Sequence, residues 1–474
     1  MTVRSGRRIG DQRVRVERVT PQDYRVAPPK RIRRPPSPWL VLILGFAALI
    51  TIGTILLLLP VSTAAGRSTA PLEALFTATS AVCVTGLVVV DTATHWSPFG
   101  HAVILGLIQI GGFGFMTGST LILLLLVGRR TGLRDRMVVQ ASTGASDLGT
   151  VTSLVKRIAL FTIAAEVIGA IALFLAFLGR GIDAVQAAWW GVFHAISAFN
   201  NAGFDLIGDF RSLTPFADDP YVLIPVAVLI VLGGIGFALI GDVAGKRRWS
   251  RLALETKIVL LTTVALIVGG TIAIGVFEWE NPATLGGLPV EQRPLNALFE
   301  SITLRTAGFN ALETGELLEA SLFVAMALMF IGGASGSTAG GIKVNTFSIL
   351  LVAIVSTARG RPSAEAFGRR IPHILIYRAI SVALLSIALL FLVSLGLELT
   401  SDGSFVQVLF EAVSAVGTVG ASTGITPDLP DSARLIVIPT MFIGRLGTLT
   451  LVLALTARQR PTSHRPAVES IRIG

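Results

Sequence analysis

The chain has 474 residues, of which 52% are hydrophobic and only 14% are charged, and this composition is too apolar for a soluble multidomain protein of that length. It predicts a protein that crosses a membrane many times. The single cysteine, Cys83, excludes a disulfide framework within one chain and a cysteine-based metal cluster.

Most of the formal net charge of +10 lies at the start of the chain, where residues 1–37 hold eleven Lys or Arg against three acids. This stretch is poor in large aliphatic residues, so we predict a disordered cytoplasmic tail that lies against anionic membrane lipid. A specific protein contact is the alternative. Because the charge is confined to this tail, we expect no nucleic acid as a partner, and the charged region is too long for a signal peptide.

Eight apolar runs follow, each long enough to cross a bilayer, which takes about 20 residues. They cover roughly 38–60, 101–128, 154–179, 220–245, 252–277, 318–356, 371–398 and 433–457. Inside each consecutive pair lies a segment with a helical pattern that is too short to span, at about 71–83, 185–199, 291–304 and 404–416.

This pattern predicts an all-α polytopic membrane protein of four tandem helix–pore-helix–helix repeats. It would have eight transmembrane helices and four re-entrant pore helices around a pseudo-fourfold pore, because unpaired backbone is tolerated at membrane depth only beside a watery cavity. The predicted repeats are residues 38–140, 141–250, 251–365 and 366–458, and a cytoplasmic tail covers 459–474.

Each short segment runs from an aromatic residue into a glycine that follows small or β-branched residues. Glycine adopts backbone angles closed to other residues, so four such loops can turn their carbonyls toward one axis. Rings of carbonyl oxygen replace the water around a potassium ion. The predicted potassium filter comprises Val84, Thr85, Gly86, Asn201, Ala202, Gly203, Thr306, Ala307, Gly308, Thr418, Val419 and Gly420.

The orientation follows from the distribution of charge. Lys and Arg gather in the links between repeats, and the links inside the repeats are acidic. The positive-inside rule therefore predicts a multi-pass protein of the cytoplasmic membrane with both termini in the cytoplasm. The outer mouth would be acidic, which raises the local concentration of cations before they enter.

A second repeated string, "IGGFG" at 110–114, "LGGIG" at 232–236, "IGGASG" at 331–336 and "IGRLG" at 443–447, lies in the second helix of each repeat. Small residues there either let helices pack closely or leave width for an ion path. In the third copy, residues 332–345 hold five glycines and three hydroxyl residues. Because each glycine costs about 1 kcal/mol in a helix interior, the helix should break there, beneath the filter.

We interpret this broken segment as a gating loop, and a rigid packing kink is the alternative. In the fourth copy Arg445 replaces a glycine, and an ionisable residue within a span, which costs roughly 3 kcal/mol, is a functional candidate. A positive charge there would set a barrier to potassium unless it forms a structural salt bridge away from the path. The predicted gate comprises Gly332, Gly333, Ser335, Gly336, Ser337, Thr338, Gly340, Gly341, Lys343 and Arg445, although Lys343 could instead snorkel to the cytoplasm.

The strings "FTATSAVCVTGLVVVD" (76–91), "FHAISAFNNAGFD" (193–205), "FESITLRTAGFN" (299–310) and "FEAVSAVGTVGASTGIT" (410–426) closely resemble the Trk/Ktr/HKT superfamily of potassium transporters. The resemblance covers about 38–457 and looks strongest to the bacterial KtrB type of membrane subunit. It implies potassium uptake through a channel-like pore with one filter loop per repeat. A serine at the first filter glycine would imply sodium permeation, and that residue is Gly86 here.

The resemblance also implies that the loop moves on activation, that an arginine occupies the place of Arg445, that the protein is a homodimer, and that a separate KtrA-like cytoplasmic nucleotide-binding ring regulates it. K⁺ is then the transported ion, no organic cofactor is expected in this chain, and activation by Na⁺ stays open. The third repeat is one residue shorter and carries Arg305 before its loop. We interpret Arg305 as supporting the filter through backbone carbonyls or through Glu300 or Glu411, unless it reaches the outer water.

An enzyme is not expected. "GASTG" at 420–424 fits a nucleophile-elbow pattern but follows a helical segment, and "GSTAGGIK" fails the P-loop spacing. The alternative that survives is a cation-coupled secondary carrier of a different substrate. The spans lack the carboxylates that a proton relay needs, and Glu166 is the clearest intramembrane acid.

Overall fold

The computed structural model describes residues 38–130 and 148–447. The predicted basic tail 1–37, the link 131–147, the end of the eighth apolar run and the tail 459–474 lie outside the described residues. The α-helices are α1 (Pro38–Leu57), α2 (Pro71–Val82), α3 (Thr92–His95), α4 (Pro98–Arg130), α6 (Leu148–Gly179), α7 (Ala184–Phe199), α8 (Pro220–Ile235), α9 (Phe237–Lys246), α10 (Leu254–Glu278), α11 (Arg293–Thr303), α12 (Glu319–Phe330), α13 (Val344–Ala358), α14 (His373–Glu398), α15 (Phe405–Gly417) and α16 (Asp431–Leu446). Short 3₁₀ helices cover Pro60–Ser62, Thr214–Phe216, Trp249–Arg251, Leu285–Gly287 and Thr314–Glu316.

Local sequence signals explain where the helices begin. Proline occupies the first position of α2 and α8 (Pro71 and Pro220), where its missing N–H costs nothing and its fixed φ suits a helix. The Asp183 carboxylate caps α7 by accepting from two backbone N–H groups. Ser404 and Gln407 form a capping box at the start of α15, which satisfies two backbone donors at once.

The described helices differ in their capacity to cross a membrane. Three of them are long and apolar enough to do so alone, namely residues Val155–Gly179 of α6, α10 and α14. A fourth span is possible if α8 and α9 are taken together. In the described part of the chain no further helix meets that length and composition by itself, with α1 and α4 judged over Leu42–Leu57 and Pro98–Gly114 alone. The predicted number of eight spans therefore stays a prediction.

Two of the eight predicted apolar runs are interrupted, and for one of them the sequence predicted the break. The segment 318–356 ends as a helix at Phe330 and resumes at Val344, which places the break across the glycine-rich segment. The apolar run 220–245 is divided into α8 and α9, which meet at 93°, a bend that the sequence did not predict. The break lies at Gly236, whose φ is +83°, an angle that favours glycine over other residues.

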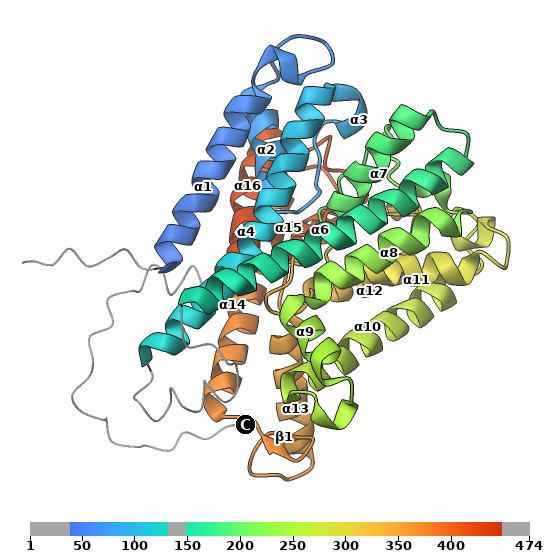
Figure 1. The fold of residues 1–474 in the computed structure, drawn as a ribbon. Helices are drawn as coiled ribbons and strands as arrows, with labels where there is room; N and C mark the ends of the chain where they lie inside the picture. The colour runs from blue at the N-terminus through green and yellow to red at the C-terminus, as the bar shows by residue number, and fades with distance from the viewer. Residues whose placement is uncertain (1–37, 131–147, 448–474) are drawn as a thin grey trace, which may run out of the picture. The chain divides into compact units, whose positions relative to one another are not determined.

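Apolar cores join neighbouring repeats. The side chain of Phe76 on α2 shares a core with Val437 and Met441 on α16, so the first and last predicted repeats pack together. Phe199 on α7 shares a second core with Phe299 on α11. A third core contains Phe410 of α15 together with residues of α11 and α12. The ends of the described chain are therefore brought side by side, as the blue and red helices of Figure 1 show.

One small element departs from the all-α prediction. Strands β1 (Glu365–Ala366) and β2 (Arg369–Arg370) pair antiparallel around a two-residue turn. Both turn residues, Phe367 and Gly368, have positive φ, which is typical of a type I′ hairpin turn. This hairpin lies at the predicted boundary between the third and fourth repeats.

Candidate functional site

The four predicted filter glycines contact one another in a closed ring. Each glycine lies very close to the next loop of the ring. A Cβ added to it would clash with a carbonyl oxygen of that loop, and this oxygen belongs to the residue just before the next filter glycine. These Cβ-to-oxygen distances would be 2.4 Å from Gly86 to Ala202, 2.7 Å from Gly203 to Ala307, 2.3 Å from Gly308 to Val419 and 2.2 Å from Gly420 to Thr85. Carbonyl oxygens from four distant parts of the chain therefore gather around one axis.

The backbone of the four loops is strained in the same way. A residue two positions before each glycine has positive φ: Val84 at 55°, Asn201 at 57°, Thr306 at 74° and Thr418 at 49°. Three of these four residues are β-branched, and such residues rarely adopt this conformation. Each costs of order 1–3 kcal/mol and persists only where the surroundings impose it. The surroundings therefore hold these loops in a conformation that local preference opposes.

Serine residues six positions before three of the glycines provide part of that support, and we did not identify them from the sequence. The Ser80 hydroxyl accepts a hydrogen bond from Gly86 N at 3.1 Å, and the Ser414 hydroxyl accepts one from Gly420 N at 3.2 Å. The Ser197 hydroxyl instead donates to the carbonyl of Phe204 at 2.7 Å. The common spacing of six residues was the signal that could have revealed them.

A second set of supporting side chains directly follows the repeated phenylalanine of three short helices. Glu300 accepts hydrogen bonds from the backbone N–H groups of Ala311 and Leu312 at 2.8 and 3.0 Å. Glu411 accepts from the hydroxyls of Ser422 and Thr426, and His194 Nε2 lies 3.4 Å from Leu206 N. These three side chains bind residues that follow the second, third and fourth filter glycines. They therefore hold the part of each loop that lies after its glycine.

The predicted pairing of Arg305 with Glu300 or Glu411 is wrong, because those two carboxylates are occupied by loop groups. Arg305 is 8% exposed, and its Nε has no hydrogen-bond partner among the described residues. Its side chain lines a small cavity of about 10 Å³ together with Asn201 and Gly333. Arg305 therefore lies between the second loop and the interrupted segment of the third repeat, and no carbonyl contact of its guanidinium is observed in the described part of the chain.

The interrupted segment, residues 332–345, lies directly against the glycine loops. The Thr338 hydroxyl is 3.1 Å both from the carbonyl oxygen of Phe199 and from Asn201 Oδ1. The backbone N–H of Gly340 donates to the Thr306 hydroxyl at 3.1 Å. A Cβ on Gly340 would lie 2.5 Å from the carbonyl oxygen of Gly417, so the segment touches the second, third and fourth loops.

The same segment explains the bend between α8 and α9. The N–H groups of Ala334 and Thr338 donate to the carbonyls of Gly234 and Gly233 at 2.8 and 3.2 Å. These bonds satisfy carbonyls at the end of α8 that have no partner within the helix. A Cβ on Gly236 would approach the carbonyl of Gly336 to 3.2 Å, so the glycine also permits close packing.

Other predicted gate residues shape the segment itself. Its two ends pair through Gly332, whose N–H donates to the Ile342 carbonyl at 2.9 Å. Gly336 and Gly341 have positive φ. Ser335 is exposed and its N–H donates to Asn345 Oδ1, so the Ser335 side chain does not meet the filter. The buried hydroxyl of Ser337 has no partner among the described residues.

Two basic residues of the predicted gate bind carbonyls of this segment. Arg445, near the end of α16, is 1% exposed, and its Nη1 donates to the carbonyl of Thr338. Lys343 Nζ donates to the carbonyl of Ala339. The fourth repeat thus holds the segment from one side while Asn201 holds Thr338 from the other.

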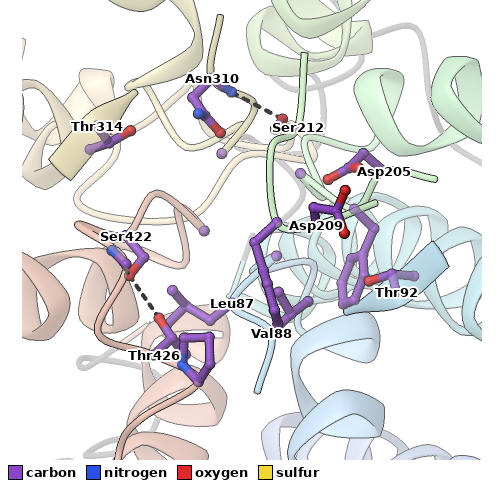
Figure 2. A pocket seen from close by; sticks show the side chains of 18 of the residues that line it. Leu87, Val88, Thr92, Asp205, Asp209, Ser212, Asn310, Thr314, Ser422 and Thr426 are labelled. Carbon is purple, nitrogen blue, oxygen red and sulfur yellow. Dashed lines mark hydrogen bonds between the residues drawn. The ribbon is translucent and has the colours of Figure 1, made fainter. Parts of the chain in front are cut away.

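A pocket of about 180 Å³ lies on the opposite side of the ring and is lined by all four filter glycines. Figure 2 shows it among side chains from the four repeats, with Asp205 and Asp209 on one side. Glu313 also lines it. Burial, together with the nearby charge of Asp91, raises the pKa of Asp205 to about 6. This mouth therefore combines backbone oxygens with carboxylates, which attract cations.

Comparisons with known proteins show the family of this chain. The family model TrkH, described as a cation transport protein, matches residues 36–462. The Ktr system potassium uptake protein B of Bacillus subtilis is 41% identical over 91% of this chain and 95% of its own length. The potassium/sodium uptake protein NtpJ of Enterococcus hirae is 37% identical over 94% of this chain and 99% of its own length.

A solved structure shares the fold. The crystal structure of the potassium transporter TrkH from Vibrio parahaemolyticus matches with a TM-score of 0.70, covering 90% of this chain and 86% of that chain at 19% identity. At 19% identity this match supports a shared fold and nothing further. The fold is therefore TrkH-like and mostly helical.

Proposed function

Because the chain belongs to the TrkH family of cation transport proteins, we propose that it takes up potassium across the cytoplasmic membrane through a channel-like pore. The observation that carries this proposal is the closed ring in which the glycines of four loops contact the carbonyls of Thr85, Ala202, Ala307 and Val419. Carbonyl oxygens in such a ring can replace the hydration shell of K⁺. Two similar proteins are named for potassium uptake, which supports the choice of ion.

In this proposal α2, α7, α11 and α15 are re-entrant pore helices, and eight spans surround them with both termini in the cytoplasm. Glycine occupies the critical position in all four loops, which favours potassium over sodium in this superfamily. The twelve predicted residues form the filter, and the acidic pocket is its outer mouth. Arg305 supports the second loop and the gating segment from behind.

Residues 332–345 act as the gate. The segment is hydrogen-bonded to the second and third loops and to Arg445, so it must leave these contacts before an ion can pass. A buried arginine charge beside the path adds a barrier to cations. We further propose a homodimer and a separate cytoplasmic nucleotide-binding subunit that moves the gate, since relatives are named as parts of a Ktr system. Activation by Na⁺ is a further open part of the proposal.

Uptake of radioactive rubidium into proteoliposomes tests the function. A potassium pore gives saturable uptake driven by the membrane potential, and potassium competes with it. Gly203→Ser and Gly308→Ser should abolish this uptake because each added side chain meets a filter carbonyl. Gly45→Ser on α1 is the matched control, since a Cβ there meets nothing within 4 Å. Equal uptake by all three variants would refute the pore, and uptake of another substrate would indicate a coupled carrier.

A further inference from the structure

A polar cluster lies beside the second loop, on the side facing α4 and α6. It consists of Glu166 on α6, Gln109 on α4 and Asn200 at the end of α7, and we call it the carboxyl–amide cluster. Glu166 is 6% exposed, although Ile163 and Val167 beside it on the same helix are at least half exposed. Burying a carboxyl group in an apolar helix costs folding free energy unless hydrogen-bond partners surround it. The groups that Glu166 binds therefore indicate what this carboxyl group does.

Hydrogen bonds join the three side chains into one unit. Gln109 Nε2 donates to Glu166 Oε2 at 3.1 Å. Asn200 Nδ2 donates to Gln109 Oε1 at 2.8 Å and lies 3.2 Å from Glu166 Oε1. The Asn200 amide also reaches the carbonyl of Ile196 at 2.9 Å. The acceptor oxygens of Glu166 and Gln109 thus fix the orientation of a single amide group.

That amide belongs to the residue that ends α7 and begins the second loop. Asn200 is the C-cap of α7 and directly precedes the filter residue Asn201, whose side chain is held by Thr338 of the gating segment. A Cβ on Gly112 of α4 would lie 2.0 Å from Asn200 Oδ1, so α4 also packs tightly on this residue. The second loop is therefore clamped at its start by the cluster and at its next residue by the gate.

The other three described loops differ at this position. The residues three positions before their glycines are Cys83, Arg305 and Gly417, and none of them carries a side-chain amide. The second loop therefore has a side-chain anchor of its own, which reaches back to a membrane helix outside the ring.

We propose that Glu166 is a positioning residue for ion selectivity, acting on the second filter loop through Gln109 and Asn200. This inference rests on the proposed function. Without the carboxylate, Asn200 loses one of its acceptors and Gln109 loses the acceptor that orients its own amide. The Asn200 amide is then held less firmly, so the carbonyl of Ala202 shifts relative to the ring. Discrimination between K⁺ and Na⁺ depends on the positions and number of such carbonyls. The pore stays conducting, but it discriminates less.

The test compares Glu166→Leu and Glu166→Gln in proteoliposomes, with inhibition of rubidium uptake by K⁺ and by Na⁺ as the readout. The ratio of the two inhibition constants does not depend on how much protein folds. We expect Glu166→Leu to lower the K⁺/Na⁺ ratio about tenfold, equal to about 1.4 kcal/mol. Glu166→Gln should retain most of the discrimination, because its carbonyl oxygen still accepts from Asn200.

Thr162→Val is the matched control. Thr162 lies one helical turn away on α6, is 2% exposed and has a hydroxyl without a partner among the described residues, so its ratio should equal that of the wild type. If Glu166→Leu does not fold, Gln109→Leu keeps the carboxylate but removes the Gln109 bridge between Glu166 and Asn200, and its ratio should also fall.

The outcomes separate the two proposals. A wild-type ratio in Glu166→Leu, or in Gln109→Leu where the first does not fold, would overturn the role of Glu166 and leave a purely structural residue. A wild-type protein that takes up no rubidium would refute the proposed function itself. An equal fall in the ratio for Thr162→Val would also overturn the inference, because the effect would then belong to α6 in general.

Discussion

The most direct test of the ring is the replacement of Gly420 by alanine. A Cβ at this position would lie 2.2 Å from the carbonyl oxygen of Thr85 and 3.0 Å from the Cα of Gly86. An ordinary contact begins at about 3.4 Å, so the Thr85 carbonyl would have to move by about 1 Å. This movement takes one oxygen out of the ring that would bind the ion.

The size of the effect follows from that displacement. A hydrogen bond or comparable contact to a charged group is worth about 1.5–3 kcal/mol, so loss of one carbonyl lowers K⁺ binding roughly ten- to a hundredfold. Backbone strain adds a separate cost of about 1–2 kcal/mol to folding, because Gly420 has φ +95° and alanine disfavours the left-handed region.

Gly424 separates these two effects. It has the same φ of +95°, but a Cβ there would meet nothing within 4 Å. Gly424→Ala should therefore lose stability by a similar amount and still take up rubidium, whereas Gly420→Ala should lose uptake. The measurement is rubidium flux per folded protein for the two variants, with thermal unfolding measured in parallel. Equal flux in the two variants would show that the ring carbonyls do not bind the transported ion.

Three further outcomes are expected. Because a carboxyl group is neutral below its pKa and Asp205 has a pKa of about 6, rubidium uptake should fall as the pH at the mouth drops from about 8 to about 5, and Asp205→Asn should flatten this part of the profile. Thr338→Val removes the hydroxyl contacts to the second loop, and because each hydrogen bond contributes about 1 kcal/mol, basal flux without a regulatory partner should rise several-fold. Ser335→Ala, at an exposed hydroxyl, is the control. Unchanged basal flux in the Thr338 variant would contradict a closed gate held by that contact. Ser414→Ala leaves the N–H of Gly420 without its acceptor, which should lower the stability of the fold by about 1–3 kcal/mol and weaken the preference for K⁺. Thermal unfolding measures the first effect and ion competition the second. If both stay at their wild-type values, the Ser414 hydroxyl does not support the filter.

Much of the local structure follows from the sequence because its causes are local. The short helices were predicted at about 71–83 and 185–199, and they cover Pro71–Val82 and Ala184–Phe199. Their lengths reflect a proline or an aspartate cap at the start and strained residues before a glycine at the end. The glycine density of 332–345 likewise predicts an interruption, since helix propensity depends on the residues of that segment alone.

The sequence by itself thus determined the membrane class, the four related glycine loops and the broken segment, because hydropathy, spacing and glycine content act over a few residues. Only the tertiary structure decided that the four loops close into one ring, that α8 bends at Gly236, and that Glu300 and Glu411 hold loops rather than Arg305. The same holds for Thr338 between Asn201 and Arg445. The partners in the ring, at the bend and around Thr338 are about a hundred or more residues apart in the chain, so which donor meets which acceptor there depends on how the repeats pack, and no local pattern contains that information.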